Sequence, residues 1–85
     1  MTKEILERLM EENPEALMAD GFGSALVGFG RIGPSKTVAV YAYEKCIEIL
    51  MNRDGMDPEE ATEYFDYNVQ GAWVGENGPV FLYDE

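Results

Sequence analysis

The sequence predicts an α+β domain in which helices pack on one face of a small antiparallel sheet. Helical and strand-like patterns follow each other in the order α-β-β-α-α-β, and no internal repeat or long linker divides them. With 85 residues, the chain can bury one hydrophobic core and has no room for a separate cofactor domain. We therefore expect residues 1–85 to form one domain whose sheet consists of a β-hairpin and a C-terminal strand.

The first expected element is an amphipathic helix. Ile5, Leu6 and Leu9 recur at helical spacing, with charged side chains on the other side. Thr2 is a suitable N-cap, and the residue before Pro14 disfavours the α-helical conformation. The helix should therefore end or bend at Pro14.

Two strands joined by a turn are expected next. Residues 24–30 and 36–41 each read as a strand, and residues 30–35 supply the turn. Residues 28–33 also match the G-x-G-x-x-G spacing of dinucleotide-binding proteins, but in those proteins a helix begins at the glycines, and here a strand follows. We therefore interpret these glycines as part of a hairpin turn and expect no cofactor.

Two helices and a last strand complete the predicted order. Helical spacing returns at Tyr43 and stops at Gly55, which is a good C-terminal cap. The next helix has a clear start, because Asp57 can cap it and Pro58 suits its first position. Residues 79–83 read as the last strand, and their initial proline suggests an edge position.

The charge of the chain restricts its partners. Its 17 acidic and 6 basic residues give a formal net charge of −11, so nucleic acid and anionic membranes should repel it. No segment approaches the roughly 18 apolar residues that span a bilayer, and the N-terminus does not resemble a signal peptide. We expect a cytoplasmic protein whose partners are basic or neutral proteins, with no direct nucleic-acid or membrane binding.

The composition also argues against catalysis. The chain has no histidine and a single cysteine, which removes the common general base and the usual zinc ligands. Carboxylates are numerous, but the pattern does not bring them together in a cleft. We expect no enzymatic activity, no catalytic residues, no metal site and no cofactor.

Three residues are expected to have structural roles. Cys46 lies on the apolar side of its helix, which predicts a buried and unreactive thiol. Trp73 is expected in the core, because so small a domain needs its large aromatic side chains for burial. Asn68 falls on the inner side of its helix, where we expect it to bond to the backbone of a neighbouring loop.

The fourth element carries the candidate binding surface. Glu59, Glu63, Asp66 and Gln70 follow each other at spacings of four, three and four residues, which places them in one row along a helix, and Asp57 and Glu60 widen the row at its N-terminal end. Neighbours in such a row are about 5 to 6 Å apart, a spacing comparable with that of successive phosphates in nucleic acid. The row could instead be a solvated helix face. The predicted partner-binding residues are Asp57, Glu59, Glu60, Glu63, Asp66, Tyr67 and Gln70.

The sequence also resembles a family of small, mostly uncharacterised proteins of bacteriophages and bacteria. The segment 55–81 is most similar, with further similarity in residues 25–30, 38–41 and 46–51, so that the resemblance covers roughly residues 20–83. It implies an accessory phage-type gene product that would work in the host cytoplasm. Small acidic proteins of this kind often inhibit host machinery, but the resemblance carries no site residues.

Two functions follow as expectations. The first is a non-enzymatic inhibitor or modulator that presents the acidic helix to a basic host protein, which could be one that binds nucleic acid. The second is a small-ligand-binding or structural homo-oligomeric accessory protein. It is suggested by the glycine-rich hairpin with Arg31 and Lys36, by the loop 71–79, and by a last strand that could pair with a copy of itself in a homodimer.

Overall fold

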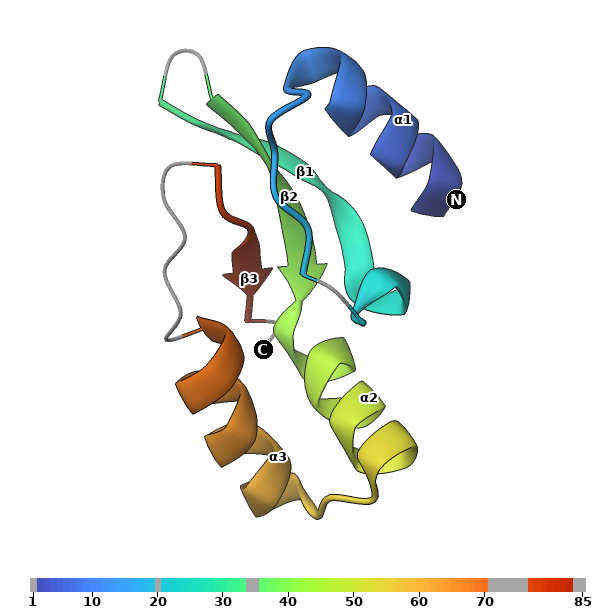
Figure 1. Cartoon of the computed structure of the whole chain (residues 1–85), viewed down its shortest axis with the longest axis vertical. Coiled ribbons are helices and arrows are strands. Elements are labelled where there is room, and N and C mark those ends of the chain that lie inside the picture. The colour runs from blue at the N-terminus through green and yellow to red at the C-terminus, as the bar shows by residue number, and fades with distance from the viewer. Residues whose placement is uncertain (1, 20, 34–35, 71–76, 84–85) are drawn as a thin grey trace.

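The α+β class and the predicted order of elements are confirmed in a computed structural model of the chain (Figure 1). The structure describes residues 2–19, 21–33, 36–70 and 77–83. Two short helical turns, η1 and η2, are added to the predicted elements. The bounds are α1 (Thr2–Glu12), η1 (Gly23–Ala25), β1 (Leu26–Ile32), β2 (Lys36–Ala42), α2 (Tyr43–Asp54), α3 (Pro58–Phe65), η2 (Asp66–Gln70) and β3 (Val80–Leu82).

The three strands form a mixed sheet in the order β1-β2-β3. β1 and β2 are antiparallel, as predicted, whereas β3 runs parallel to β2, with Val80 opposite Val40 (Figure 1). The prediction of a wholly antiparallel sheet is therefore wrong for β3. The reason lies in the connection: α2 and α3 lie between β2 and β3 in the sequence, and a helical crossover of this kind can return the chain to enter the sheet in the same direction.

β1 lies two residues later in the chain than the sequence predicts, because Ser24 and Ala25 belong to η1. The predicted turn began at Gly30, but the pairing of β1 with β2 continues to Ile32 opposite Lys36. Gly28 and Gly30 therefore lie inside β1, and Gly33, with a φ of 71°, begins the turn. Because β1 leads into a second strand and not a helix, the dinucleotide-binding arrangement is absent from this part of the described chain.

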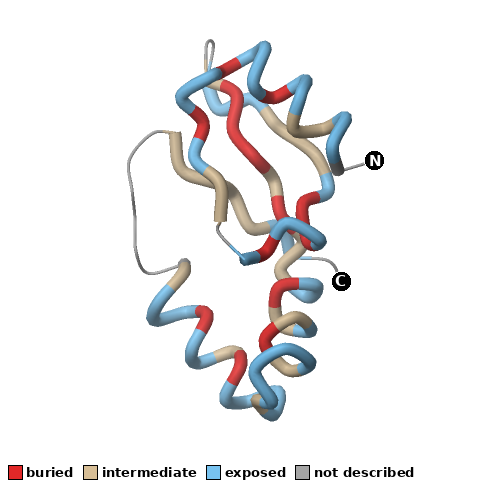
Figure 2. The backbone as a smooth tube through the Cα atoms, turned by 45° about the vertical axis from the view of Figure 1, so that its right-hand side comes forward, coloured by how far each residue is buried: buried red, intermediate tan, exposed pale blue. Residues whose placement is uncertain are grey.

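The main core cluster lies on the α1 face of the sheet and continues between the helices, and Val38 is fully buried on the opposite face. α1 contacts β1 and β2, and Leu9 of α1 is fully buried together with Ala39 and Tyr41 of β2. α2 starts directly at the end of β2, so α2 and α3 pair beyond the end of the sheet (Figure 1). The predicted position of the helices over one face of the sheet therefore holds for α1. The buried residues of α2 and α3 extend the core beyond the end of the sheet (Figure 2).

Among the described residues, no helix combines the length and the apolar character that crossing a membrane requires.

Trp73, which the sequence predicts in the core, lies outside the described residues. Cys46 is fully buried, as predicted, and burial raises the pKa of its thiol to about 11. A thiol with so high a pKa is protonated near neutral pH and is a poor nucleophile.

Candidate partner-binding surface

α3 begins with two reciprocal hydrogen bonds. The Asp57 carboxylate accepts from the backbone N–H of Glu60 at 2.8 Å, and the Glu60 carboxylate accepts from the backbone N–H of Asp57 at 3.4 Å. Pro58 occupies the first helical position. Two of the seven predicted site residues, Asp57 and Glu60, therefore already stabilise the start of the helix, although both remain exposed.

The inner side of α3 is fixed by one aromatic residue. Phe65 is fully buried, and its ring makes edge-to-face contacts with Phe22, Tyr43 and Phe81 at centroid distances of 5.8, 5.2 and 4.9 Å. These partners come from the segment before η1, from the start of α2 and from β3. Because Phe65 is held from three sides, the rotation of α3 about its own axis is set, and so is the outer face of the helix.

Glu59 and Glu63 occupy that outer face. Both are exposed, and they are separated by four residues, so their side chains lie next to each other on the helix. In the part of the chain that the structure describes, neither carboxylate makes a hydrogen bond or an ion pair. The first two acids of the predicted row are therefore not neutralised by a described basic side chain.

The row does not continue as a regular α-helix. α3 ends at Phe65, and residues 66–70 form the π-helical turn η2, so the predicted α-helical spacing stops before Gln70, whose side chain lies outside the described part. The side-chain amide of Asn68 donates to the carbonyl of Tyr64 at 3.1 Å and so competes for the carbonyl that an α-helix would use there. Asn68 is exposed and bonds within its own helix, so the prediction that it bonds to a neighbouring loop is wrong.

Tyrosines border the acidic side chains. Asp66 accepts a hydrogen bond of 3.5 Å from the Tyr43 hydroxyl, and the ring of Tyr43 stacks on Tyr83 with centroids 4.2 Å apart. Burial raises the pKa of Tyr43, and the neighbouring Asp66 carboxylate raises it further. Tyr67, a predicted site residue, is 87% exposed.

Sequence reasoning missed Tyr64 as a member of this surface. Its spacing from Ala61 and Phe65 follows the apolar helical repeat, which predicts an inward-facing side chain. In the structure Ala61 and Phe65 are fully buried, whereas Tyr64 is 44% exposed. A tyrosine at the margin of an apolar stripe can turn its ring outward, and only the position of the neighbouring helix decides between the two.

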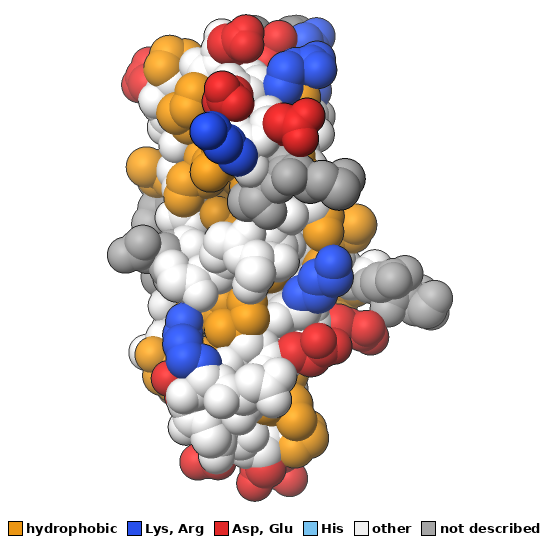
Figure 3. All heavy atoms as spheres, turned by 90° about the vertical axis from the view of Figure 1, so that its right-hand side faces the viewer, with side chains coloured by type: hydrophobic (Ala, Val, Ile, Leu, Met, Phe, Trp, Pro, Cys, Tyr) orange, Lys and Arg blue, Asp and Glu red, His pale blue; other side chains and the backbone are white. Residues whose placement is uncertain are grey.

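The charge pattern distinguishes α3 from the other helices. α1 contains Lys3 and Arg8 among its acids, and α2 contains Lys45 and Arg53. The side of the molecule formed by α1 and α2 accordingly shows acidic and basic side chains interspersed (Figure 3). Residues 57–70, by contrast, contain five acids and neither lysine nor arginine. The outer face of α3 is therefore negative along its whole length.

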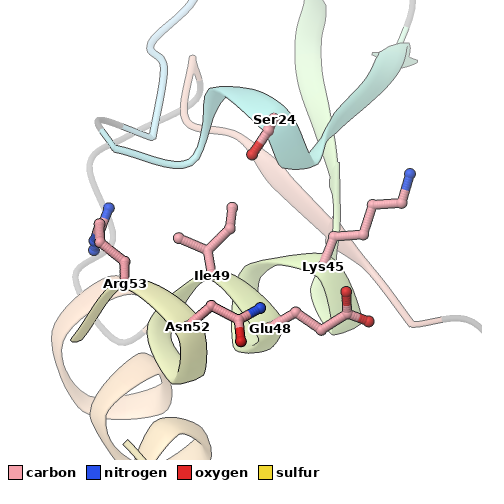
Figure 4. Close-up of a pocket in the computed structure, with 6 residues that line it drawn as sticks. All are labelled: Ser24, Lys45, Glu48, Ile49, Asn52 and Arg53. Atoms are coloured by element: carbon pink, nitrogen blue, oxygen red, sulfur yellow. The ribbon is translucent and has the colours of Figure 1, made fainter. Parts of the chain in front are cut away.

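A second feature is a shallow, open depression of about 480 Å³ between η1 and α2 (Figure 4). Its lining side chains carry both signs of charge, and Arg53 is held at its margin by a 2.9 Å hydrogen bond to the carbonyl of Gly21 and by Asp54. We assign no ligand to this depression. It is lined by Ser24, Lys45, Glu48, Ile49, Asn52 and Arg53.

Within residues 2–19, 21–33, 36–70 and 77–83, no three acidic or cysteine side chains lie close enough together to hold a metal ion. No protein-family model, curated protein or solved structure matches the chain. The resemblance to small phage and bacterial proteins therefore stays a prediction.

Proposed function

We propose that this chain is a non-enzymatic inhibitor or modulator that binds a basic surface of a host protein through the outer face of α3. The observation that carries the proposal is the pair Glu59 and Glu63, exposed and without a described partner on a helix that has no basic residue. The capping hydrogen bonds at Asp57 and the burial of Phe65 hold this helix in place before a partner arrives. A surface arranged in advance loses less conformational entropy on binding.

The partner surface is one that ordinarily holds nucleic acid. Exposed carboxylates one helical turn apart lie about 5 to 6 Å from each other, which suits a groove lined with lysine and arginine. The chain itself, at a net charge of −11, is repelled by nucleic acid and attracted by such a groove. Electrostatic attraction of this kind mainly accelerates association and weakens as salt is added.

Tyr67 supplies contact area beside the charges. Its side chain is 87% exposed, and it follows Asp66, whose carboxylate is already positioned by Tyr43. Tyrosine is enriched among the residues that dominate binding energy, because it buries a large apolar ring and keeps a polar tip. In the proposed complex, Glu59 and Glu63 direct the approach, and Tyr67 is covered on contact. The phage-type origin and the host cytoplasm as the site of action belong to the same proposal.

The proposal is tested by charge reversal with a matched control. The variant Glu59→Lys/Glu63→Lys reverses the outer face of α3, and Glu7→Lys/Glu11→Lys makes the same change of net charge at the same spacing on exposed positions of α1. Asp66 is left intact because it holds Tyr43. Each tagged protein is used to capture proteins from a lysate of the natural host, with elution in steps of increasing salt.

We expect the wild type and the α1 variant to retain the same partner, and the α3 variant to lose it. Added duplex DNA should release the partner from the wild type, since the groove is shared. Retention of the partner by the α3 variant would reject the outer face of α3 as the binding surface. Equal loss from both variants would mean that only net charge matters, and would reject the proposed site as well.

A further inference from the structure

β1 is an edge strand, so one of its two sides has no neighbouring strand in the sheet. It pairs with β2 on one side, and in the described parts of the chain the backbone of residues 27–32 makes no hydrogen bond to any other segment. Outer strands are usually protected by proline, by lysine or by inward-pointing charges. β1 has neither proline nor lysine. Its one charged residue, Arg31, lies on the α1 side and pairs with Glu12, and its pairing with β2 is irregular only between Leu26 and Gly28. The regular edge formed by residues 28–32 can accept another strand.

The face of β1 away from α1 carries two glycines and one apolar side chain. The register with β2 places Gly28, Gly30 and Ile32 on this face, because residues alternate between the two faces of a strand. A side chain added at Gly28 would meet no atom of the described residues within 4 Å, so none of these residues fills the space above it. Ile32, in contrast, projects an apolar side chain that is 50% exposed.

We propose that β1 pairs antiparallel with β1 of a second copy, about a two-fold axis at Gly30, to join the two sheets into one. In this register Gly30 lies opposite its own copy, and Ile32 lies opposite Gly28 of the second copy. The exposed isoleucine of each chain then packs over Gly28 of the other. Such a self-complementary contact is what a two-fold interface requires.

The charges near β1 favour a second copy over an unrelated strand. Arg8 lies over the ring of Phe29 at 5.8 Å, and Glu12 lies 3.8 Å from Arg31. The register at Gly30 sets Phe29 opposite Arg31 of the second copy, so it also brings Arg8 towards Glu12 of that copy. The two opposite charges therefore meet twice, once on each side of the axis. Residues 21–43 contain no acid, so this edge also lies in the longest acid-free stretch of a strongly negative chain.

Disulfide trapping tests the register. Residues directly opposite each other in an antiparallel pair have Cα atoms about 4.5 to 5.5 Å apart, within the range of a disulfide. The variant Gly30→Cys should therefore form a covalent dimer on mild oxidation. Gly28→Cys and Ile32→Cys should each stay monomeric, because four residues of strand, about 13 Å, separate each cysteine from its own copy. A mixture of these two variants should crosslink. Cys46 is buried and stays out of the reaction.

The mass of the untreated protein gives an independent readout. In analytical ultracentrifugation we expect the wild type to reach twice its 9.5 kDa monomer mass as concentration rises, and Ile32→Glu to remain a monomer with unchanged circular dichroism. A wild type that stays monomeric would overturn the proposal, as would equal crosslinking of all three single-cysteine variants. These measurements use the purified chain alone, so their result is independent of whether α3 binds a host protein.

Discussion

Asn13 is a buried polar side chain whose hydrogen bonds connect three parts of the chain. Its amide donates to the carbonyl of Thr37 at 2.7 Å and to the side-chain oxygen of Asn77 at 3.0 Å, and its own oxygen accepts from the backbone N–H of Glu15 at 3.1 Å. The end of α1 is thereby tied to β2 and to the residues before β3. The sequence indicates only the end of a helix at this position, because Thr37 and Asn77 are distant in the chain and no local pattern reveals them.

Replacing Asn13 should therefore be costly. Asn13→Ala leaves the buried carbonyl of Thr37 without its donor, and we expect the free energy of unfolding to fall by about 1 to 3 kcal/mol. Asn52→Ala is the control, since Asn52 is exposed and makes no hydrogen bond to a described residue. Urea denaturation measures both. A loss no larger for Asn13→Ala than for Asn52→Ala would show that this connection does not stabilise the fold.

At the scale of the elements, the sequence predicts what is decided locally. The start of α3 at Asp57 and Pro58 and the end of α2 at Gly55, with a φ of 68°, depend on the chemistry of one or two residues, and both are confirmed. The parallel direction of β3 was missed, because it depends on where α2 and α3 place the chain when it returns to the sheet. The π-helical turn η2 was missed because α-helical spacing in a sequence does not reveal that the Asn68 amide competes for a carbonyl.

In the candidate site, too, some features follow from a local sequence pattern and others depend on contacts between distant residues. The exposure of Glu59, Glu63 and Tyr67 was predicted from helical periodicity and is seen in the structure. The hydrogen bond from Tyr43 to Asp66 joins residues 23 positions apart and could not be read from a local pattern. Only the packing of α2 against α3 brings these two residues together.

Different residues of α3 should contribute to stability and to partner binding. Asp57→Ala removes the cap, and we expect a loss of about 1 kcal/mol in the free energy of unfolding, with partner capture weakened less than by Glu59→Ala. Glu59→Ala, two residues away, removes an exposed carboxylate without a described partner, and should weaken capture while leaving stability within about 0.5 kcal/mol of the wild type. Urea denaturation and salt-step elution measure the two effects. A Glu59→Ala variant that is destabilised but binds normally would assign the acids of α3 a structural role only.

At the scale of the whole molecule, the two proposed surfaces lie apart. The structure is elongated, 38 × 25 × 24 Å, with β1 and α1 towards one end and α3 at the other (Figure 1). Pairing through β1 would therefore leave the outer face of α3 open in both copies. A dimer would present two acidic helices at once, which strengthens binding to a partner that offers two basic surfaces within reach.

The most direct test of the central claim is a comparison of backbone amide chemical shifts of the ¹⁵N-labelled chain with and without the purified host partner. We expect the largest shift changes in residues 59–67 and small changes along α1. Strong changes on α1 or around the depression between η1 and α2, with residues 59–67 unaffected, would contradict the assignment of α3 as the binding helix.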